Sequence, residues 1–150
     1  DFIYYYEKGF RANKIGIPAG VYSNTPLIQN VEARYCQYYS KFLAHHGLNS
    51  ARKFFTGESF DGSIVGKSLD WYLFKLDPTN QILIDRINEK FENSEQMISQ
   101  LDPNFQNQIN NNNIKMLQTF DAIQEAVPLL KIDMLASLNI NIDYVDADGD

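Results

Sequence analysis

Cysteine, histidine and long apolar runs are scarce in this 150-residue sequence. Cys36 is the single cysteine, so no disulfide can form within the chain and cysteine content does not indicate a redox compartment. No stretch reaches the roughly 18 to 20 apolar residues that a membrane-spanning helix needs. Residues 1–20 also lack the basic segment and following apolar segment of an export signal. The sequence therefore predicts no transmembrane segment.

Positive charge is scarce as well. The 13 Lys and Arg residues against 19 Asp and Glu give a formal net charge of -6, and such a field repels phosphate backbones. We therefore expect no nucleic-acid partner. Apolar residues are plentiful, and a chain of this length can bury roughly 70% of the surface that its unfolded form exposes. One folded domain spanning residues 1–150 is expected.

Glycine and proline divide the first half of the chain into helical segments. Residues 2–12 favour a helix, and the glycines and proline of residues 14–20 predict a shaped loop. From about Pro26, apolar and aromatic residues recur at helical spacing until Gly47 and predict one amphipathic helix. Shorter helices are expected at residues 50–56 and 68–76, on either side of a glycine-containing loop.

The second half carries the clearest helical pattern. Residues 78–101 and residues from about 105 or 109 to 138 each place apolar side chains on one seam. We expect these two segments to pack antiparallel in an all-α, four-helix-bundle-like domain with almost no sheet outside residues 140–145. The apolar stripe continues through Pro128, which predicts a kink in the last helix rather than its end. The asparagines of residues 110–113 predict no more than a frayed turn.

Several motifs occur in an order that resembles imelysin-like bacterial envelope proteins. The first is the segment RANKIGIPAG at residues 11–20. Next come Glu32, Tyr35 and Ser40, and then a glycine-containing loop followed by Asp70, Tyr72 and Leu73. The last resemble the family's final helix and its terminal Asp-Gly-Asp, at residues 127–134 and 146–150. The match covers nearly the whole chain.

This resemblance implies a protein of the bacterial periplasm or outer-membrane surface, built from two helical bundles with a functional cleft between them. The chain resembles the second bundle, with an N-terminal imelysin-like bundle as its expected partner. The family's signature, Gly-x-His-x-x-Glu, lies in the first half, and no His-x-x-Glu occurs here. Because the sequence starts without Met or a helix cap, we expect it to be part of a longer protein. A partner chain or homodimer is expected to cover its aromatic start.

The segment at residues 11–20 is the main candidate binding site. Backbone N–H groups and two cations could receive an anion there, or the carboxylates around a bound metal; alternatively the basic residues simply favour a helix C-terminus. Glu32 and Ser40 could equally cap neighbouring backbone. The candidate ligand-binding residues are Arg11, Lys14, Gly16, Pro18, Gly20, Glu32, Tyr35 and Ser40.

Three further groups of side chains are candidates for binding a metal ion or a ligand. His45 and His46 diverge by about 100° on a helix, so they favour a helix end over a shared metal site. Asp146, Asp148 and Asp150 resemble the start of a calcium loop but lack its closing Glu, and an acidic solvated terminus is the simpler interpretation. The tyrosines near residues 4–6 and 35–39 could line a cleft or bind iron, although packing between helices explains them better.

No catalytic set can be assembled from two adjacent histidines and scattered carboxylates. The leading hypothesis is a binding component linked to iron or haem acquisition. Its rivals are a metallopeptidase half whose metal ligands lie in the other bundle, and a purely structural or interaction bundle. The identity of any metal stays open.

Overall fold

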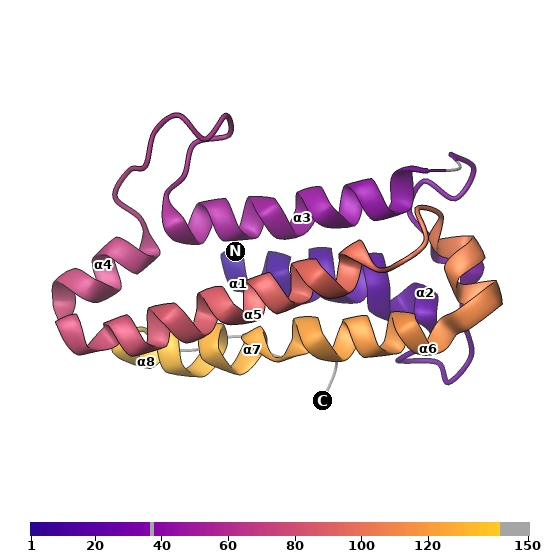
Figure 1. The fold of residues 1–150 in the computed structure, drawn as a ribbon. Helices are drawn as coiled ribbons and strands as arrows, with labels where there is room; N and C mark the ends of the chain where they lie inside the picture. Colours follow the sequence, from indigo (N-terminus) through magenta and orange to yellow (C-terminus); the bar gives the residue numbers. More distant parts are fainter. Residues whose placement is uncertain (37, 142–150) are drawn as a thin grey trace.

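The computed structural model describes residues 1–36 and 38–141, and it confirms an all-α fold (Figure 1). A first helical rod joins α1 (Phe2–Tyr4), the π-helix η1 (Tyr5–Gly16) and α2 (Ile17–Ala19). A connecting segment with the short 3₁₀ turn η2 (Ile28–Asn30) leads to α3 (Tyr39–Thr56). After a loop, α4 (Leu69–Leu76) and η3 (Pro78–Asn80) lead into α5 (Gln81–Ser99).

The last rod begins with α6 (Phe105–Gln124) and continues through α7 (Ala126–Pro128), the π-helix η4 (Leu129–Met134) and α8 (Leu135–Ser137). The rods alternate in direction, as Figure 1 shows. The first rod packs on α3 and α6, and α5 packs on the same two helices from the other side. The expected antiparallel packing of α5 against the last rod is therefore present.

Aromatic side chains from three rods meet at the centre of the molecule. Phe91 of α5 is 1% exposed, and its ring centroid lies 5.9 Å from that of Phe55 and 5.8 Å from that of Tyr6. The hydroxyl of Tyr6 donates a hydrogen bond to the carbonyl oxygen of Ile123 at 3.1 Å. Burial of a large aromatic side chain contributes roughly 1.5–3 kcal/mol. Tyr6 therefore joins the first rod to α5 through the ring of Phe91, and to the last rod through its hydrogen bond to Ile123.

The prediction of a loop at residues 14–20 is wrong, because the first rod stays helical to Ala19. Ile17 N–H bonds to the carbonyl of Ala12, and Gly20 N–H closes the turn on the carbonyl of Ile17 at 3.1 Å. Pro18 lies in the first turn of α2, where the chain gives up only one N–H donor. Gly16 is kept for space: a Cβ there would lie 2.6 Å from Cε2 of Phe120 on α6.

The helix expected from Pro26 to Gly47 is also wrong in both bounds. Val31 is extended and Ala33 has φ +53°, a left-handed conformation that a right-handed helix cannot include. The helix begins only at Tyr39 and continues through Gly47 to Thr56, so it absorbs the separate helix expected at residues 50–56. Gly47 faces the first rod, where an added Cβ would lie 3.1 Å from the Phe10 ring.

The later elements follow the sequence pattern closely. Asp77 caps the turn before α5 by accepting from the backbone N–H of Thr79 at 2.9 Å. In α6, Asn112 leaves helical geometry (φ -160°, ψ 80°), a kink where only a frayed turn was expected. Pro128 itself stays helical with φ -61° and ψ -35°, and the hydrogen-bond pattern changes to π-helical after it. The chain therefore continues through this proline as one rod.

Sheet structure in the described part is limited to an isolated bridge between Glu58 and Val65. Most of residues 140–145, and the acidic residues Asp146, Asp148 and Asp150, lie outside the described residues. Among the residues that are described, no helix is long and apolar enough to cross a bilayer.

Candidate functional site

Three of the residues expected to bind a ligand meet between the first rod and the segment before α3. Lys14 Nζ lies 2.5 Å from Oε2 of Glu32, and Ser40 Oγ donates to the backbone carbonyl of Glu32 at 2.9 Å. The Lys14 side chain is 15% exposed and that of Glu32 is 44% exposed. These contacts fix the irregular segment to the first rod, which is the tying role that the sequence left open for Glu32 and Ser40.

The other expected residues do not join this group. Tyr35 is 86% exposed, with the Arg34 guanidinium 4.5 Å from its ring centroid. Gly16 serves helix packing, Pro18 accepts at its carbonyl from Leu27 N–H at 2.9 Å, and Gly20 ends α2 with φ +86°. The geometry assigns a structural role to these glycines and this proline, and gives no glycine-shaped anion loop.

Arg11 lies on a different part of the first rod and is 3% exposed. Its guanidinium carbon lies 4.9 Å from the ring centroid of Phe120. One helical turn earlier Glu7 is 2% exposed, and its Oε1 lies 3.3 Å from Nζ of Lys131 on η4. The other carboxylate oxygen, Oε2, is buried and accepts no hydrogen bond from the part of the chain that is described. We call Glu7, Arg11 and Lys131 the charged cluster.

Burial of charged groups costs free energy, so the charged cluster is a candidate functional site. Removing charges from water is expensive even when they pair, and ion pairs are seldom the most stable way to fill an interior. A buried polar atom without a partner costs about 1–3 kcal/mol more. Glu7 and Arg11 lie on π-helix η1 and Lys131 on π-helix η4. Such helices are rare and occur frequently at functional sites.

The charged cluster combines side-chain donors with one acceptor that has no donor among the described residues. Glu7 Oε2 can accept a hydrogen bond from a ligand hydroxyl, N–H or water. Arg11 carries five N–H donors in a planar fork that suits carboxylates, and it can hold a ligand and a protein partner at once. The sequence motifs indicated Arg11 but neither Glu7 nor Lys131. Their signal was the spacing of Glu7 and Arg11 on the same face as Tyr6 and Phe10.

The surroundings of Tyr5 and Tyr6 in the first rod oppose the role of iron ligand that the sequence left open for them. Burial, followed by the nearby Glu32 carboxylate, raises the pKa of Tyr5, and burial raises the pKa of Tyr6 strongly. Ferric iron binds the deprotonated phenolate form of tyrosine, so a raised pKa opposes coordination. Tyr6 serves the core instead, and Tyr38 is 70% exposed. Packing between helices accounts for Tyr6, and Tyr5 also reaches α3, where its hydroxyl donates to the carbonyl oxygen of Gly47 at 3.4 Å.

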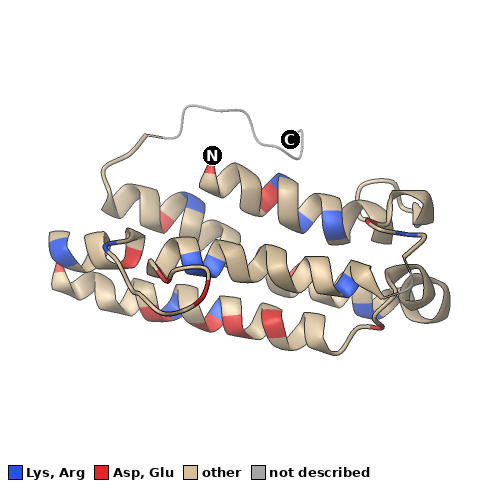
Figure 2. Ribbon diagram, turned by 90° about the horizontal axis from the view of Figure 1, so that it is seen from above, with Lys and Arg blue, Asp and Glu red and all other residues tan. Residues whose placement is uncertain are grey.

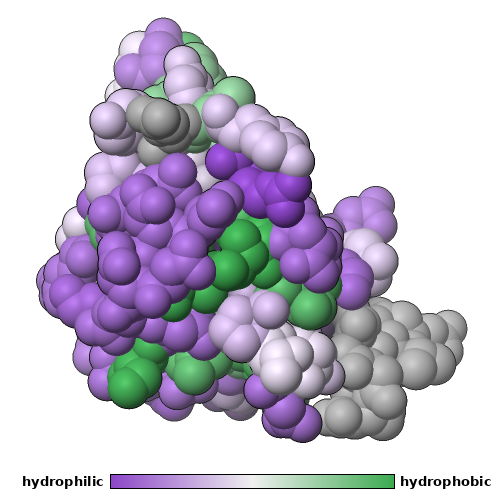
Figure 3. All heavy atoms as spheres, turned by 90° about the vertical axis from the view of Figure 1, so that its right-hand side faces the viewer, coloured by the Kyte–Doolittle hydropathy of each residue, from purple (hydrophilic) through white to green (hydrophobic). Residues whose placement is uncertain are grey.

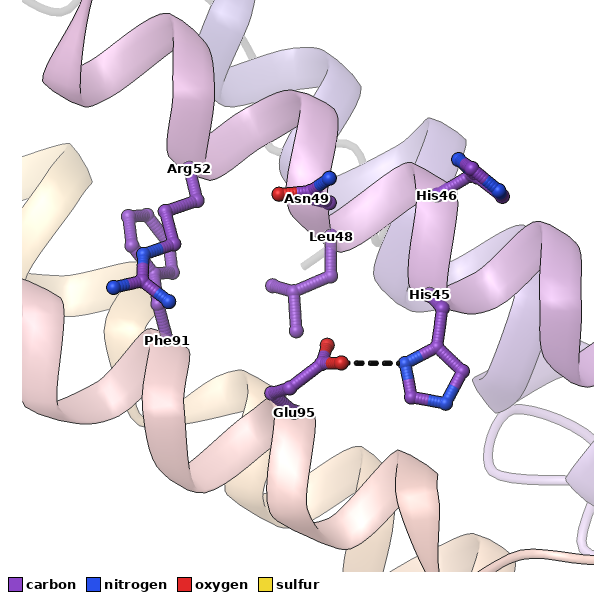
Figure 4. A pocket seen from close by; sticks show the side chains of 7 residues that line it. All are labelled: His45, His46, Leu48, Asn49, Arg52, Phe91 and Glu95. Atoms are coloured by element: carbon purple, nitrogen blue, oxygen red, sulfur yellow. Dashed lines mark hydrogen bonds and ion pairs between the residues drawn. The ribbon is translucent and has the colours of Figure 1, made fainter. Parts of the chain in front are cut away.

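A second polar site lies in the groove between α3 and α5 (Figure 4). Its volume is about 300 Å³, and Leu48 and Phe91 contribute apolar surface. His45 and Glu95 point toward each other across it, with Nδ1 of His45 2.7 Å from Oε1 of Glu95. Arg52 lies at the other end beside Phe91 and 3.5 Å from Glu92. The His45–Glu95 pair therefore lies toward one end of the groove, and the Arg52–Glu92 pair lies toward the other.

These pairs belong to a row of contacts that joins α3 to α5. Lys41 Nζ donates to the carbonyl oxygens of Ser99 at 2.5 Å and Leu101 at 2.8 Å, at the C-terminal end of α5. The helix dipole stabilises a positive charge at this end of a helix. Figure 2 shows that charged residues of both signs are distributed along the helices. The row explains the His45–Glu95 pair as a link between helices without requiring a ligand.

The histidines lie inside α3 and not at its end, so the helix-end interpretation is wrong. The two side chains diverge, as expected for adjacent positions on a helix. His46 points away from the groove in Figure 4, and its ring lies 4.1 Å from that of Phe42. Within residues 1–36 and 38–141, no group of three or more His, Cys, Asp or Glu side chains is placed to hold a metal ion.

No family model, curated protein or solved structure matches the chain. The imelysin-like relationship is therefore a proposal carried by the order of the sequence motifs.

Proposed function

We propose that this chain is the second bundle of an imelysin-like protein of the bacterial envelope, and that it binds an anionic iron complex or haem at the charged cluster. The partner in the complete protein is the N-terminal bundle. The observation that carries the ligand site is the buried Glu7 Oε2, to which no group of residues 1–36 and 38–141 donates a hydrogen bond, beside Lys131 and one turn from Arg11. Such an oxygen is a ready acceptor for a ligand group.

The contacts among the motifs support treating them as one unit. Lys14 from the first motif pairs with Glu32 from the second, and Ser40 bonds to the same residue. Gly16 of the first motif packs on Phe120 in the last rod, which also carries the residues resembling the family's final helix. Sequence segments that resemble the family in order are thus joined by side-chain contacts in space.

Electrostatics favour an anionic complex over a bare metal ion. A ferric or zinc ion next to Glu7 would lie close to the ammonium of Lys131 and the guanidinium of Arg11, and like charges repel at short range. The carboxylates of a ferric chelate or of haem match the fork of Arg11 instead. Lys131, whose side chain is 14% exposed, gives the cluster an edge toward solvent through which a ligand carboxylate can reach it.

Replacing Glu7 by glutamine is expected to weaken binding of haem or ferric citrate by about tenfold or more. A ligand hydroxyl or an iron-bound water would then donate to a neutral amide oxygen in place of the carboxylate, and a charge-assisted hydrogen bond contributes roughly 1.5–3 kcal/mol. Isothermal titration calorimetry on residues 1–150 measures the change. Glu89→Gln is the matched control, since Glu89 is an exposed carboxylate on α5. It is expected to leave both affinities unchanged.

A second substitution guards against a loss of folding. Arg11→Lys keeps the positive charge and the apolar stem but removes the planar fork that lies over Phe120, so it is expected to weaken carboxylate binding, and circular dichroism verifies that the variant is folded. Arg11→Ala is less informative because Arg11 is buried against Phe120, and truncation removes packing as well. Unchanged affinity in both Glu7→Gln and Arg11→Lys would reject the charged cluster as the site.

A further inference from the structure

An apolar groove lies at the end of the molecule that carries α4. We call it the α4 groove; its volume is about 850 Å³, and it lies between Lys53 and Phe54 of α3, Leu69, Trp71 and Tyr72 of α4, and Phe60 of the intervening loop. Phe60 is 93% exposed, Phe54 61% and Tyr72 52%. Exposed aromatic side chains gathered around one hollow indicate a binding surface rather than ordinary surface variation.

The apolar surface continues beyond this groove. A second cavity of about 660 Å³ shares Phe54 and Leu69 with it and extends between the start of the first rod and α8. Phe2 and Phe54 stack between them with ring centroids 5.0 Å apart. The combined surface is long and open, which suits an elongated occupant better than a small molecule enclosed on most sides.

The spacing of the groove residues matches a helix-packing surface. One wall of the groove starts at Ser50 and continues three, four and seven positions later with Lys53, Phe54 and Gly57. Residues at this spacing lie on one face of a helix. On the other wall, Leu69 and Tyr72 are three positions apart on α4. The large apolar side chain on the α3 wall is Phe54, and it faces the apolar side chains of α4 across the hollow. Two helices arranged in this way leave room for a third helix, whose side chains fit between theirs.

Charge at the rim specifies the occupant further. Lys53 already pairs with Glu58, with their atoms 3.1 Å apart. Lys67 lies 5.0 Å from the ring centroid of Trp71 and makes no ion pair with a carboxylate of the described residues. A cation held over an aromatic ring at the edge of an apolar surface can pair with an acidic side chain of the occupant.

The opposite end of the molecule has a different character. Figure 3 shows that end covered mainly by hydrophilic residues, with hydrophobic residues at its centre and in smaller groups near its edges. The α4 groove therefore does not reflect a general lack of polar surface.

We propose that the α4 groove binds an amphipathic helix of a partner protein, with large apolar side chains against Phe54, Leu69 and Trp71 and an acidic side chain against Lys67. This mode is the helix-in-groove recognition that uses apolar anchors at helical spacing. The proposal does not depend on the iron ligand, because none of the groove residues belongs to the charged cluster. Either proposal can fail while the other stands.

Trp71 is the only tryptophan in the sequence, so its fluorescence reports on the surroundings of α4, where Trp71 lines the α4 groove and a smaller neighbouring pocket beside Phe74. The probe is a synthetic peptide of about 18 residues, long enough for several helical turns, with Leu at helical spacing and Glu on the flanks. A twin peptide carries Lys at the flanking positions. Neither contains tryptophan. Titration of residues 1–150 is expected to give a saturable blue shift of Trp71 emission with the Glu peptide.

Lys67→Glu is expected to lower the affinity for the Glu peptide by roughly three- to tenfold, because an exposed ion pair is lost. The same substitution is expected to raise the affinity for the Lys peptide, because an ion pair of opposite polarity can form. Lys75→Glu makes the same charge change on α4 outside the groove and serves as the matched control. Tyr72→Asp places a charge in the groove and is expected to abolish the shift with both peptides. Circular dichroism verifies that all three variants are folded.

Several outcomes would overturn this assignment. No emission shift with either peptide at millimolar concentration would show that the groove does not bind a helix. Equal effects of Lys67→Glu and Lys75→Glu would remove the role of Lys67. A shift that follows protein concentration alone would indicate a second copy of this chain as the occupant. A shift seen only with phosphatidylcholine vesicles would indicate a membrane surface.

Discussion

Replacing Gly20 by alanine is expected to lower the free energy of unfolding by about 3 kcal/mol or more. Gly20 has φ +86°, where an L-residue costs roughly 1–2 kcal/mol. An added Cβ would also lie 2.4 Å from the backbone carbonyl carbon and oxygen of Thr25. Backbone cannot rotate away as a side chain can, so strain of roughly 1–3 kcal/mol is added. Urea denaturation followed by circular dichroism measures the loss.

Gly62→Ala separates the two causes of this loss. Gly62 has a similar φ of +74°, but an added Cβ would meet only Oε1 of Glu58, at 3.1 Å. That carboxylate is the end of a flexible side chain and can move. The control is expected to cost about 1–2 kcal/mol, the backbone cost alone. Equal losses in the two variants would show that the contact with Thr25 has no energetic consequence.

Gly16→Ala is expected to cost about 1–3 kcal/mol, although alanine is the better helix former. The added Cβ would lie 2.6 Å from Cε2 and 2.9 Å from Cδ2 of Phe120. Phe120 is 7% exposed and also packs against Arg11 and Tyr22, so its ring has little room to retreat. The first rod would have to move away from α6.

Gly9→Ala tests the same chemistry on the same π-helix without a buried neighbour. Its Cβ would meet the ring of Tyr5, 2.9 Å away, but Tyr5 is 37% exposed and can turn outward. Because alanine lowers the backbone entropy of the unfolded chain, this variant is expected to be neutral or up to about 1 kcal/mol more stable. Chemical denaturation of both variants compares them. A Gly16→Ala protein as stable as Gly9→Ala would contradict the close approach.

Residues with strong periodicity could be placed from the sequence. The apolar seam of residues 78–101 predicted α5 because Ile84, Ile87 and Phe91 really do face the core. Asp77 and Pro78 marked its start through local hydrogen bonding, which needs no knowledge of the rest of the fold. The last rod followed for the same reason, and its apolar stripe correctly continued through Pro128.

Segments shaped by tertiary contacts could not be placed in this way. Tyr35, Tyr38 and Phe42 recur at helical spacing, yet all are exposed, and the chain around Ala33 is held by Lys14 and Ser40 instead. The glycines of the first rod suggested a loop because their need for space against α6 and Thr25 is invisible locally. Distance along the chain hides such neighbours from periodicity.

The candidate site shows the same limit. Arg11 was found through its motif, but its importance was assigned to a loop that does not exist. Glu7 and Lys131 are 124 positions apart in the sequence, so only the fold brings them together. The helical spacing of Glu7 and Arg11 between apolar positions was the available signal. It indicated that two charges would share a buried face.

Iron anomalous scattering from crystals of residues 1–150 grown with a ferric citrate or haem ligand tests the central claim most directly. The expected result is an iron peak with the ligand carboxylates against Arg11 and a donor group on Oε2 of Glu7, and its loss in crystals of Glu7→Gln. An iron peak in the α3–α5 groove at His45 and Glu95, or no bound iron at saturating ligand, would contradict the account.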